Sequence, residues 1–197
     1  MRTDQRLSAT RLATDGPFTV EGPLAEVDRG KSAVLFAESE TARADYLRHR
    51  SAAAQPNTIT YDLVSGTGDV AGYISFRVVR EDGAGSAHVF VEVESIYITP
   101  AFRRHRLSML LIHPVIAHVQ CALHVGRGEG RCSKTYIHFA SQFESMAGTR
   151  VLRALERELL LLAKTRAGVK LLGRHLEHPL GAKARLWARH LSGVASP

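Results

Sequence analysis

The sequence is poor in cysteine and has no long apolar run, and each absence excludes a class of protein. It contains two cysteines, Cys121 and Cys132, too few for the disulfide framework of a small secreted domain. No apolar stretch approaches the roughly 18 residues that a transmembrane helix needs. The beginning of the sequence lacks the apolar segment of a secretory signal. We therefore expect a protein of the reducing cytoplasm with no membrane span.

Length and composition indicate one folded domain. Apolar residues make up 45% and charged residues 23% of the 197 residues, which is ordinary for a globular protein and argues against global disorder. A chain of this length usually builds one core. We expect a single domain over residues 1–197, in which residues 1–28 form an N-terminal extension and residues 164–197 form a basic C-terminal segment.

Positive charge is concentrated at the end of the chain. The formal net charge is +7, and residues 164–197 hold seven basic residues against one acidic residue, Glu177. Such a segment favours an anionic partner, for which we consider a phosphate-bearing cofactor, nucleic acid, an acidic protein or a lipid surface. A solvated face that only aids solubility would have the same composition. The charge therefore informs about partners and not about the fold.

Alternating apolar residues predict three consecutive strands. Residues 58–64 alternate apolar and polar side chains, which is the pattern of a half-buried strand. Residues 70–80 and 87–98 are rich in β-branched and aromatic residues. They are separated by Asp82 and Gly83, a pair typical of hairpin turns. The three segments therefore predict an antiparallel meander.

Helices are expected on either side of a fourth strand. Residues 107–125 are apolar enough for a buried helix, and residues 135–140 have the composition of a strand. In residues 144–166, leucines recur every three or four positions, which predicts core packing but would also suit the seam of a homodimer or an acyl-chain groove. A further helix is expected over residues 31–53. The sequence predicts an α/β fold with a mixed, mostly antiparallel sheet flanked by helices.

A basic loop precedes the helix that is expected to start near Leu107. Pro100 ends the third strand, and four basic residues follow it: Arg103, Arg104, His105 and Arg106. A helix N-terminus presents unpaired backbone N–H groups and the positive end of the helix dipole, which suit a phosphate. Arginines add bidentate phosphate contacts. We predict phosphate binding by this loop and the backbone amides of Leu107 and Ser108; the alternative is a solvated basic turn.

Two glutamates lie on the third strand, shortly before this loop. Glu92 and Glu94 are two residues apart, so their side chains share one face of an extended strand. A carboxylate in a cleft beside a cofactor is a typical general base. We predict that one of the two, with Glu94 preferred, takes a proton from an amine. The alternative is that both are exposed or pair with nearby arginines.

One expected helix also carries several potential metal ligands. They are His113, His118, Cys121 and His124. Structural zinc sites usually have four ligands in closer pairs, so we expect satisfied or surface histidines and no metal site.

The residues around Pro100 follow a distinctive order. The run Ile96-Tyr97-Ile98-Thr99-Pro100-Ala101-Phe102-Arg103 has alternating hydrophobic residues, a proline, an aromatic residue and an arginine. This run resembles the first half of the signature of the GNAT superfamily of N-acetyltransferases. In the second half, Arg106 stands where the family usually has its first glycine, and Ser108 occupies the second small position. The hairpin, helix, strand and helix expected over residues 58–165 also resemble the family's order of elements.

The resemblance implies an N-acyltransferase. It would move an acyl group, in the first instance acetyl, from acetyl-CoA or another acyl-CoA to the amine of a small molecule or a protein. The strand backbone near Ile96 and Ile98 would hold the pantetheine arm by strand-like pairing, and the basic loop would hold the phosphates. Glu94 would act as the base. The family's usual general acid has no counterpart in this sequence.

Two other functions are compatible with the sequence. One is an N-acyl synthase of the same fold that takes its acyl group from acyl carrier protein, because residues 169–181 resemble the closing strand pair of the autoinducer synthase branch. Acyl carrier protein is acidic, which would suit the basic C-terminal segment. The other is a non-catalytic or nucleic-acid-directed protein that uses the same scaffold, whose binding would weaken steeply with salt.

Overall fold

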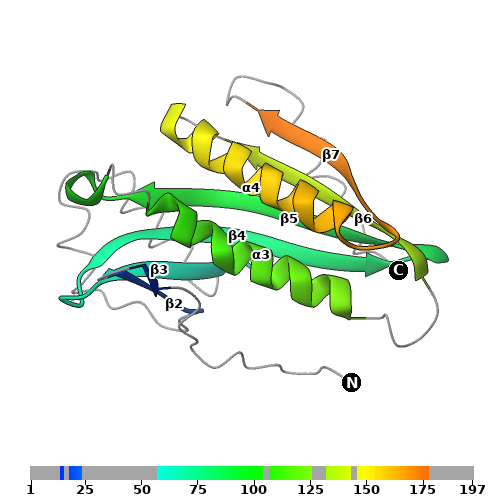
Figure 1. Ribbon diagram of the computed structural model, residues 1–197, viewed down its shortest axis with the longest axis horizontal. Coiled ribbons are helices and arrows are strands. Elements are labelled where there is room, and N and C mark those ends of the chain that lie inside the picture. Colours follow the sequence, from blue (N-terminus) through cyan, green and yellow to red (C-terminus); the bar gives the residue numbers. More distant parts are fainter. Residues whose placement is uncertain are drawn as a thin grey trace.

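The fold is a sheet with two long helices on one of its faces (Figure 1). The computed structural model describes residues 14–15, 18–23, 57–103, 107–125, 132–142 and 146–177. The strands are β1 (Thr14–Asp15), β2 (Phe18–Glu21), β3 (Ile59–Ser65), β4 (Val70–Asp82), β5 (Gly85–Ile98), β6 (Cys132–Gln142) and β7 (Val169–Glu177). The helices are the 3-10 turn η1 (Pro100–Phe102), α3 (Ser108–His124) and α4 (Met146–Lys164).

Within the described residues, the seven strands lie side by side in chain order. Each of the first four neighbouring pairs, from β1·β2 to β4·β5, is antiparallel, whereas β5·β6 and β6·β7 are parallel. Helices α3 and α4 make the two crossovers that parallel neighbours require. The predicted α/β class, with a mixed and mostly antiparallel sheet flanked by helices, is confirmed.

The predicted meander is confirmed as β3, β4 and β5. The hairpin between β4 and β5 closes at the expected turn, where the Gly83 N–H donates to the Ser86 carbonyl at 2.8 Å. The register then runs from Asp82 opposite Ala87 along both strands. Glycine is required at Gly72, because an added Cβ would lie 2.4 Å from the carbonyl oxygen of Tyr97 on β5.

The core lies between the sheet and the two helices. Side chains from β3, β4, β5 and β6 meet apolar residues of α3 and α4 there, including the fully buried Phe76, Leu111 and Phe139. The leucine face of α4 belongs to this core, since Leu155 and Leu159 have no exposed surface. Burial of leucine is strongly favourable, and one amphipathic face gives α4 its orientation.

The two ends of the chain contribute strands to the sheet. Strand β2 pairs with β3, and its Val20 is fully buried, so part of the predicted N-terminal extension belongs to the sheet. Near the other end, residues 169–177 form the strand β7, and residues 178–181 of the stretch that resembles a closing strand pair lie outside the described residues. The predicted helix over residues 31–53 and the basic residues beyond 177 lie outside the described residues.

None of the helices in the described part of the chain is long and apolar enough to cross a membrane.

Candidate functional site

Strand β5 extends beyond its pairing with the parallel strand β6 at the end that leads into the basic loop. The register between β5 and β6 ends at Val93 opposite Ser141, and the Ser141 hydroxyl donates to the Val93 carbonyl at 3.2 Å. From Glu94 to Ile98, β5 is paired with β4 alone among the described strands. This segment is therefore a strand edge on the side where β6 stops.

A β-bulge falls at the start of this edge. Ser75 lies opposite Ser95, and the next β4 residue, Phe76, lies opposite Val93, so Glu94 is the extra residue. A bulge bends the strand and redirects the side chain it carries, and bulges are common beside active sites. The predicted base, Glu94, thus lies at the point where the register between β5 and β4 shifts. The pairing between β5 and β6 ends at the same point.

Both predicted bases contact one arginine on the neighbouring strand. The Arg77 Nε lies 2.7 Å from Glu94 Oε1, and the Arg77 Nη2 lies 2.6 Å from Glu92 Oε2. The Glu94 side chain is only 7% exposed, against 37% for Glu92. Both Glu94 oxygens also accept a hydrogen bond from the Thr58 hydroxyl, at 3.2 Å each. Glu94 is thus the more enclosed and more tightly positioned carboxylate.

The face that carries Glu92 and Glu94 is the one opposite the helices. Val89, Val91 and Val93 alternate with them along β5 and pack into the core instead. Further along the same face, the Tyr73 hydroxyl lies 2.9 Å from the Ser95 hydroxyl. This polar sheet face borders the strand edge, and its Tyr73 and Glu94 side chains are largely buried.

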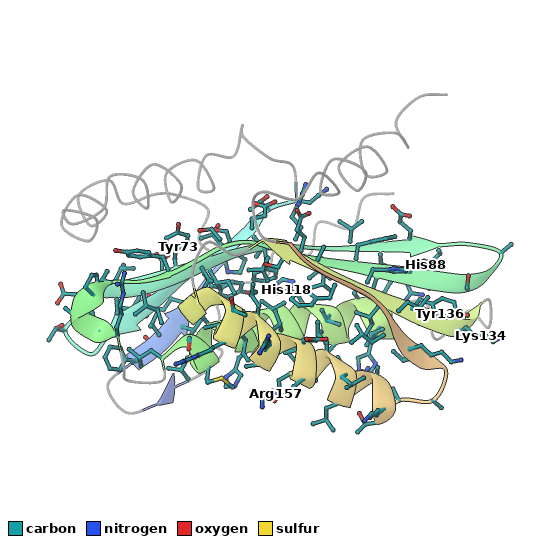
Figure 2. All side chains as sticks on the ribbon, turned by 90° about the horizontal axis from the view of Figure 1, so that it is seen from above. Tyr73, His88, His118, Lys134, Tyr136 and Arg157 are labelled. Carbon is teal, nitrogen blue, oxygen red and sulfur yellow. The ribbon has the colours of Figure 1, made fainter. Side chains whose placement is uncertain are left out.

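A second group of polar side chains occupies the other end of the sheet. His88 Nδ1 lies 2.9 Å from His138 Nε2, and the rings of Phe90 and Tyr136 stack beside them. Burial and, to a lesser degree, the charge of His88 lower the pKa of His138. Figure 2 shows His88 and Tyr136 at the end of the sheet far from Tyr73. This histidine pair is therefore separate from the β5 edge.

The chain turns sharply after β5 and enters α3. The Thr99 N–H and hydroxyl both donate to the Ala71 carbonyl, at 2.9 and 3.2 Å, which fixes the end of the strand. Arg103 folds back, so that its Nε donates to the Ile98 carbonyl at 3.0 Å and its guanidinium lies over the Tyr97 ring. Arg103 therefore braces the turn.

The N-terminus of α3 follows this turn. No side chain caps it, and its first turn holds no acidic residue. Leu107 is 4% exposed and packs in the core, so only its backbone is available to a ligand, whereas Ser108 is partly exposed. The central loop residues Arg104, His105 and Arg106 lie outside the described residues.

The histidines of α3 do not converge. His118 is packed against the rings of Tyr61 and Phe76, and its Nε2 lies 3.0 Å from the Tyr61 hydroxyl. Burial lowers the pKa of His118. Burial and, to a lesser degree, the charge of Cys121 raise the pKa of Tyr61 to about 12. His124 is exposed and contacts Arg166. Across the described ranges, no group of three or more metal-ligating side chains is close enough to hold a metal ion.

Sequence reasoning missed Arg77 and the bulge. Arg77 lies 15 residues before Glu92, and only the β4–β5 register shows that they are opposite each other. The hairpin signal at Gly83 would have placed the two residues on facing strands. The bulge has no sequence signal here, because Glu94 is not a glycine.

No family model matches the sequence, and no curated protein matches it. Solved structures do match. One is a mutant of the AtaT toxin bound to the C-terminus of the antitoxin AtaR, with 16% identity, a TM-score of 0.49, and coverage of 71% of this chain and 83% of that chain. Another is an acetyltransferase from Trypanosoma brucei, with 16% identity, a TM-score of 0.43, and coverage of 70% and 90%.

A third match is a GCN5-related N-acetyltransferase from Sphaerobacter thermophilus. Its identity is 16% and its TM-score 0.42, and the match covers 72% of this chain and 44% of that chain. These likenesses are too distant to transfer a residue role. The observed order of a hairpin, α3, β6 and α4 is the order that the GNAT resemblance implied.

Proposed function

We propose that the protein transfers an acyl group from a CoA thioester to an amine. The observation that carries this proposal is the part of β5 that continues beyond its last β6 pair at Val93, which leads within a few residues to the N-terminus of α3. A strand edge binds an extended chain, and a helix N-terminus binds phosphate. CoA contains both parts, a pantetheine arm with two amide groups and a set of phosphates.

The donor would lie along β5. The backbone near Ile96 and Ile98 would pair with the pantetheine amides, as in β-strand addition. The backbone N–H groups of Leu107 and Ser108 would face the pyrophosphate. Since Arg103 braces the turn in this structure, the bidentate phosphate contacts fall to Arg104 and Arg106. This arrangement would put the thioester at the upstream end of the edge, beside Glu94.

The chemistry requires a neutral amine. The amine nitrogen attacks the thioester carbonyl carbon, the C–S bond breaks, and the CoA thiolate leaves as the new amide forms. Glu94 would take the proton that the nitrogen gives up, directly or through one water. Arg77 and Thr58 would hold its carboxylate in one orientation. Catalysis would then consist mostly of positioning, with modest help from the base.

The test is release of free CoA thiol by the purified protein. The donors are acetyl-CoA, a long-chain acyl-CoA and acyl-loaded acyl carrier protein, each offered with a panel of small amines and lysine or N-terminal peptides. We expect acyl-CoA turnover that requires an amine. Turnover with the carrier protein alone would favour the N-acyl synthase, and no turnover with any pair would contradict acyl transfer.

Two matched variants test the base. Glu94→Gln keeps the size of the side chain but removes the proton acceptor, so turnover should fall roughly 10²- to 10⁴-fold while donor binding is unchanged. Glu92→Gln makes the same chemical change two residues away, on the same face, and should cost much less. Equal losses in the two variants, or wild-type turnover by Glu94→Gln, would remove Glu94 from this role.

A further inference from the structure

The outer face of α4 carries a row of basic side chains. Its members are Arg150, Arg153, Arg157 and Lys164, all of them exposed. At 100° per residue, they lie within about 60° of one another around the helix, and the row is about 21 Å long. Figure 2 shows Arg157 on the side of α4 that is turned away from the sheet.

The two acidic residues of α4, Glu156 and Glu158, lie on either flank of the row and not within it. Arg77 and Arg80 of the sheet form ion pairs with carboxylates, but none of the four basic side chains of the row does so in the part of the chain that the structure describes. Arg153 and Arg157 are four residues apart, a spacing at which like charges destabilise a helix. The first turn of α4 also lacks an acidic residue. An anionic partner would relieve this repulsion.

The surroundings of the row favour nucleic acid over protein. A protein interface needs an apolar or aromatic centre that is depleted of charge. The exposed face of α4 offers no aromatic residue and only one large apolar residue, Leu161. Protein–DNA interfaces are instead polar and strongly positive. Arginine, which makes up three of the four residues, fits phosphate oxygens bidentately.

The same face favours a DNA duplex. Binding of single strands relies on aromatic side chains that stack on bases, and this face has none. Recognition of duplex RNA uses contacts to its 2′-hydroxyl groups in addition to the phosphates, whereas a row of arginine and lysine side chains is matched to phosphates. We propose that the α4 row binds the phosphate backbone of double-stranded DNA without reading its sequence. This proposal does not depend on acyl transfer.

The experiment measures binding of the full-length protein to a labelled DNA duplex over a range of salt concentrations. With all four residues on phosphates, raising the salt from 50 to 200 mM should weaken binding about 100-fold. Arg153→Gln with Arg157→Gln should lower the slope of log affinity against log salt by about 2. Arg153→Lys with Arg157→Lys keeps the charge and should retain the slope.

The matched control removes the same charge elsewhere. Lys134 and Lys170 are exposed and alternate with the core residues Ile137 and Val169, so they lie on the sheet face opposite α4. Lys134→Gln with Lys170→Gln should leave the slope unchanged. A thermal melt of each variant checks folding.

Several outcomes would overturn the proposal. They are no binding of the wild type to DNA, an equal loss of slope in the control, and an unchanged slope in the Arg153/Arg157 variant. Tighter binding to duplex RNA of the same sequence would show that the partner of the row is RNA and not DNA. Binding to polyglutamate but not to a duplex would make the partner an acidic protein.

Discussion

The guanidinium of Arg77 lies 2.7 Å from the carboxylate of Glu94 on the adjacent strand. Glu94 is the bulge residue, and β5 loses its β6 partner immediately before it. The same guanidinium also reaches Glu92 at 2.6 Å. One cation therefore orients both candidate bases at the beginning of the proposed donor edge.

The single variant Arg77→Gln should be less stable than the double variant in which Glu94 is also replaced by glutamine. In Arg77→Gln, the enclosed Glu94 carboxylate loses its opposite charge, and we expect a loss of roughly 1–3 kcal/mol in the free energy of unfolding. Arg77→Gln combined with Glu94→Gln should recover part of that loss, because the enclosed carboxylate is then uncharged and the remaining one, Glu92, is 37% exposed to solvent. Urea unfolding of both single variants and the double variant measures the coupling. Additive losses would show that the contact contributes nothing.

The same substitution should also separate positioning from folding. If Arg77 orients Glu94 for proton transfer, kcat of Arg77→Gln should fall while KM for the donor stays near its wild-type value. Arg77→Lys retains the charge and should recover part of the loss. The measurement is steady-state kinetics at a temperature where all variants are folded. A change confined to KM would place Arg77 in donor binding instead.

Gly72 should tolerate no side chain. A Cβ there would lie 2.4 Å from the Tyr97 carbonyl oxygen and 3.1 Å from the Ile98 Cα, both backbone atoms of the proposed donor edge. Gly72→Ala should cost roughly 1–3 kcal/mol of stability through overpacking, and it should weaken donor binding. Gly83→Ala, where the nearest atom is 3.4 Å away, is the matched control. Equal effects in the two variants would refute the steric account.

Stability should fall below about pH 6.5 because of the half-buried His118. Burial lowers its pKa in the folded protein below the ordinary 6.5, so the unfolded chain binds more protons as the pH falls. Its contribution is complete above pH 6.5 and is lost as the pH drops toward the folded-state pKa, at a slope of at most about 1.4 kcal/mol per unit. The pKa of His138 is lowered as well, so His138 contributes to stability with the same pH dependence.

The measurement for this prediction is the urea midpoint between pH 5 and pH 8. His118→Gln should flatten the pH dependence and leave only the part that His138 contributes. A midpoint that stays constant across this range in the wild type would contradict a lowered pKa for the half-buried His118. A slope of wild-type size in His118→Gln would assign the effect to other groups.

The order of the elements could be predicted from sequence because it depends on local signals. Alternation in residues 58–64, the turn at Gly83 and the stop at Pro100 each act within a few residues. The buried face of α4 follows from the leucine spacing for the same reason. Strand β2 was less visible, since four residues give little periodicity and its place depends on pairing with the distant β3.

The site could be predicted only as a list of residues. Glu92, Glu94, Ile96 and Ile98 were identified on one strand, and the structure places all four at or near the edge that β6 leaves. Their geometry depends on the β4–β5 register, which brings Arg77 to Glu92, and on the bulge that places Glu94 at a register shift. Neither can be read from the spacing of residues along one strand.

The most direct test of the account is donor binding. A thermal-shift titration with acetyl-CoA, long-chain acyl-CoA and free CoA would be run on the wild type and on Arg104→Ala with Arg106→Ala, with Lys134→Ala and Lys170→Ala as the control. At a ligand concentration of 100 times Kd, stabilisation should reach about 2.7 kcal/mol. The account predicts this shift for the wild type and the control and its loss in the loop variant. No shift with any CoA species, or an undiminished shift in the loop variant, would contradict it.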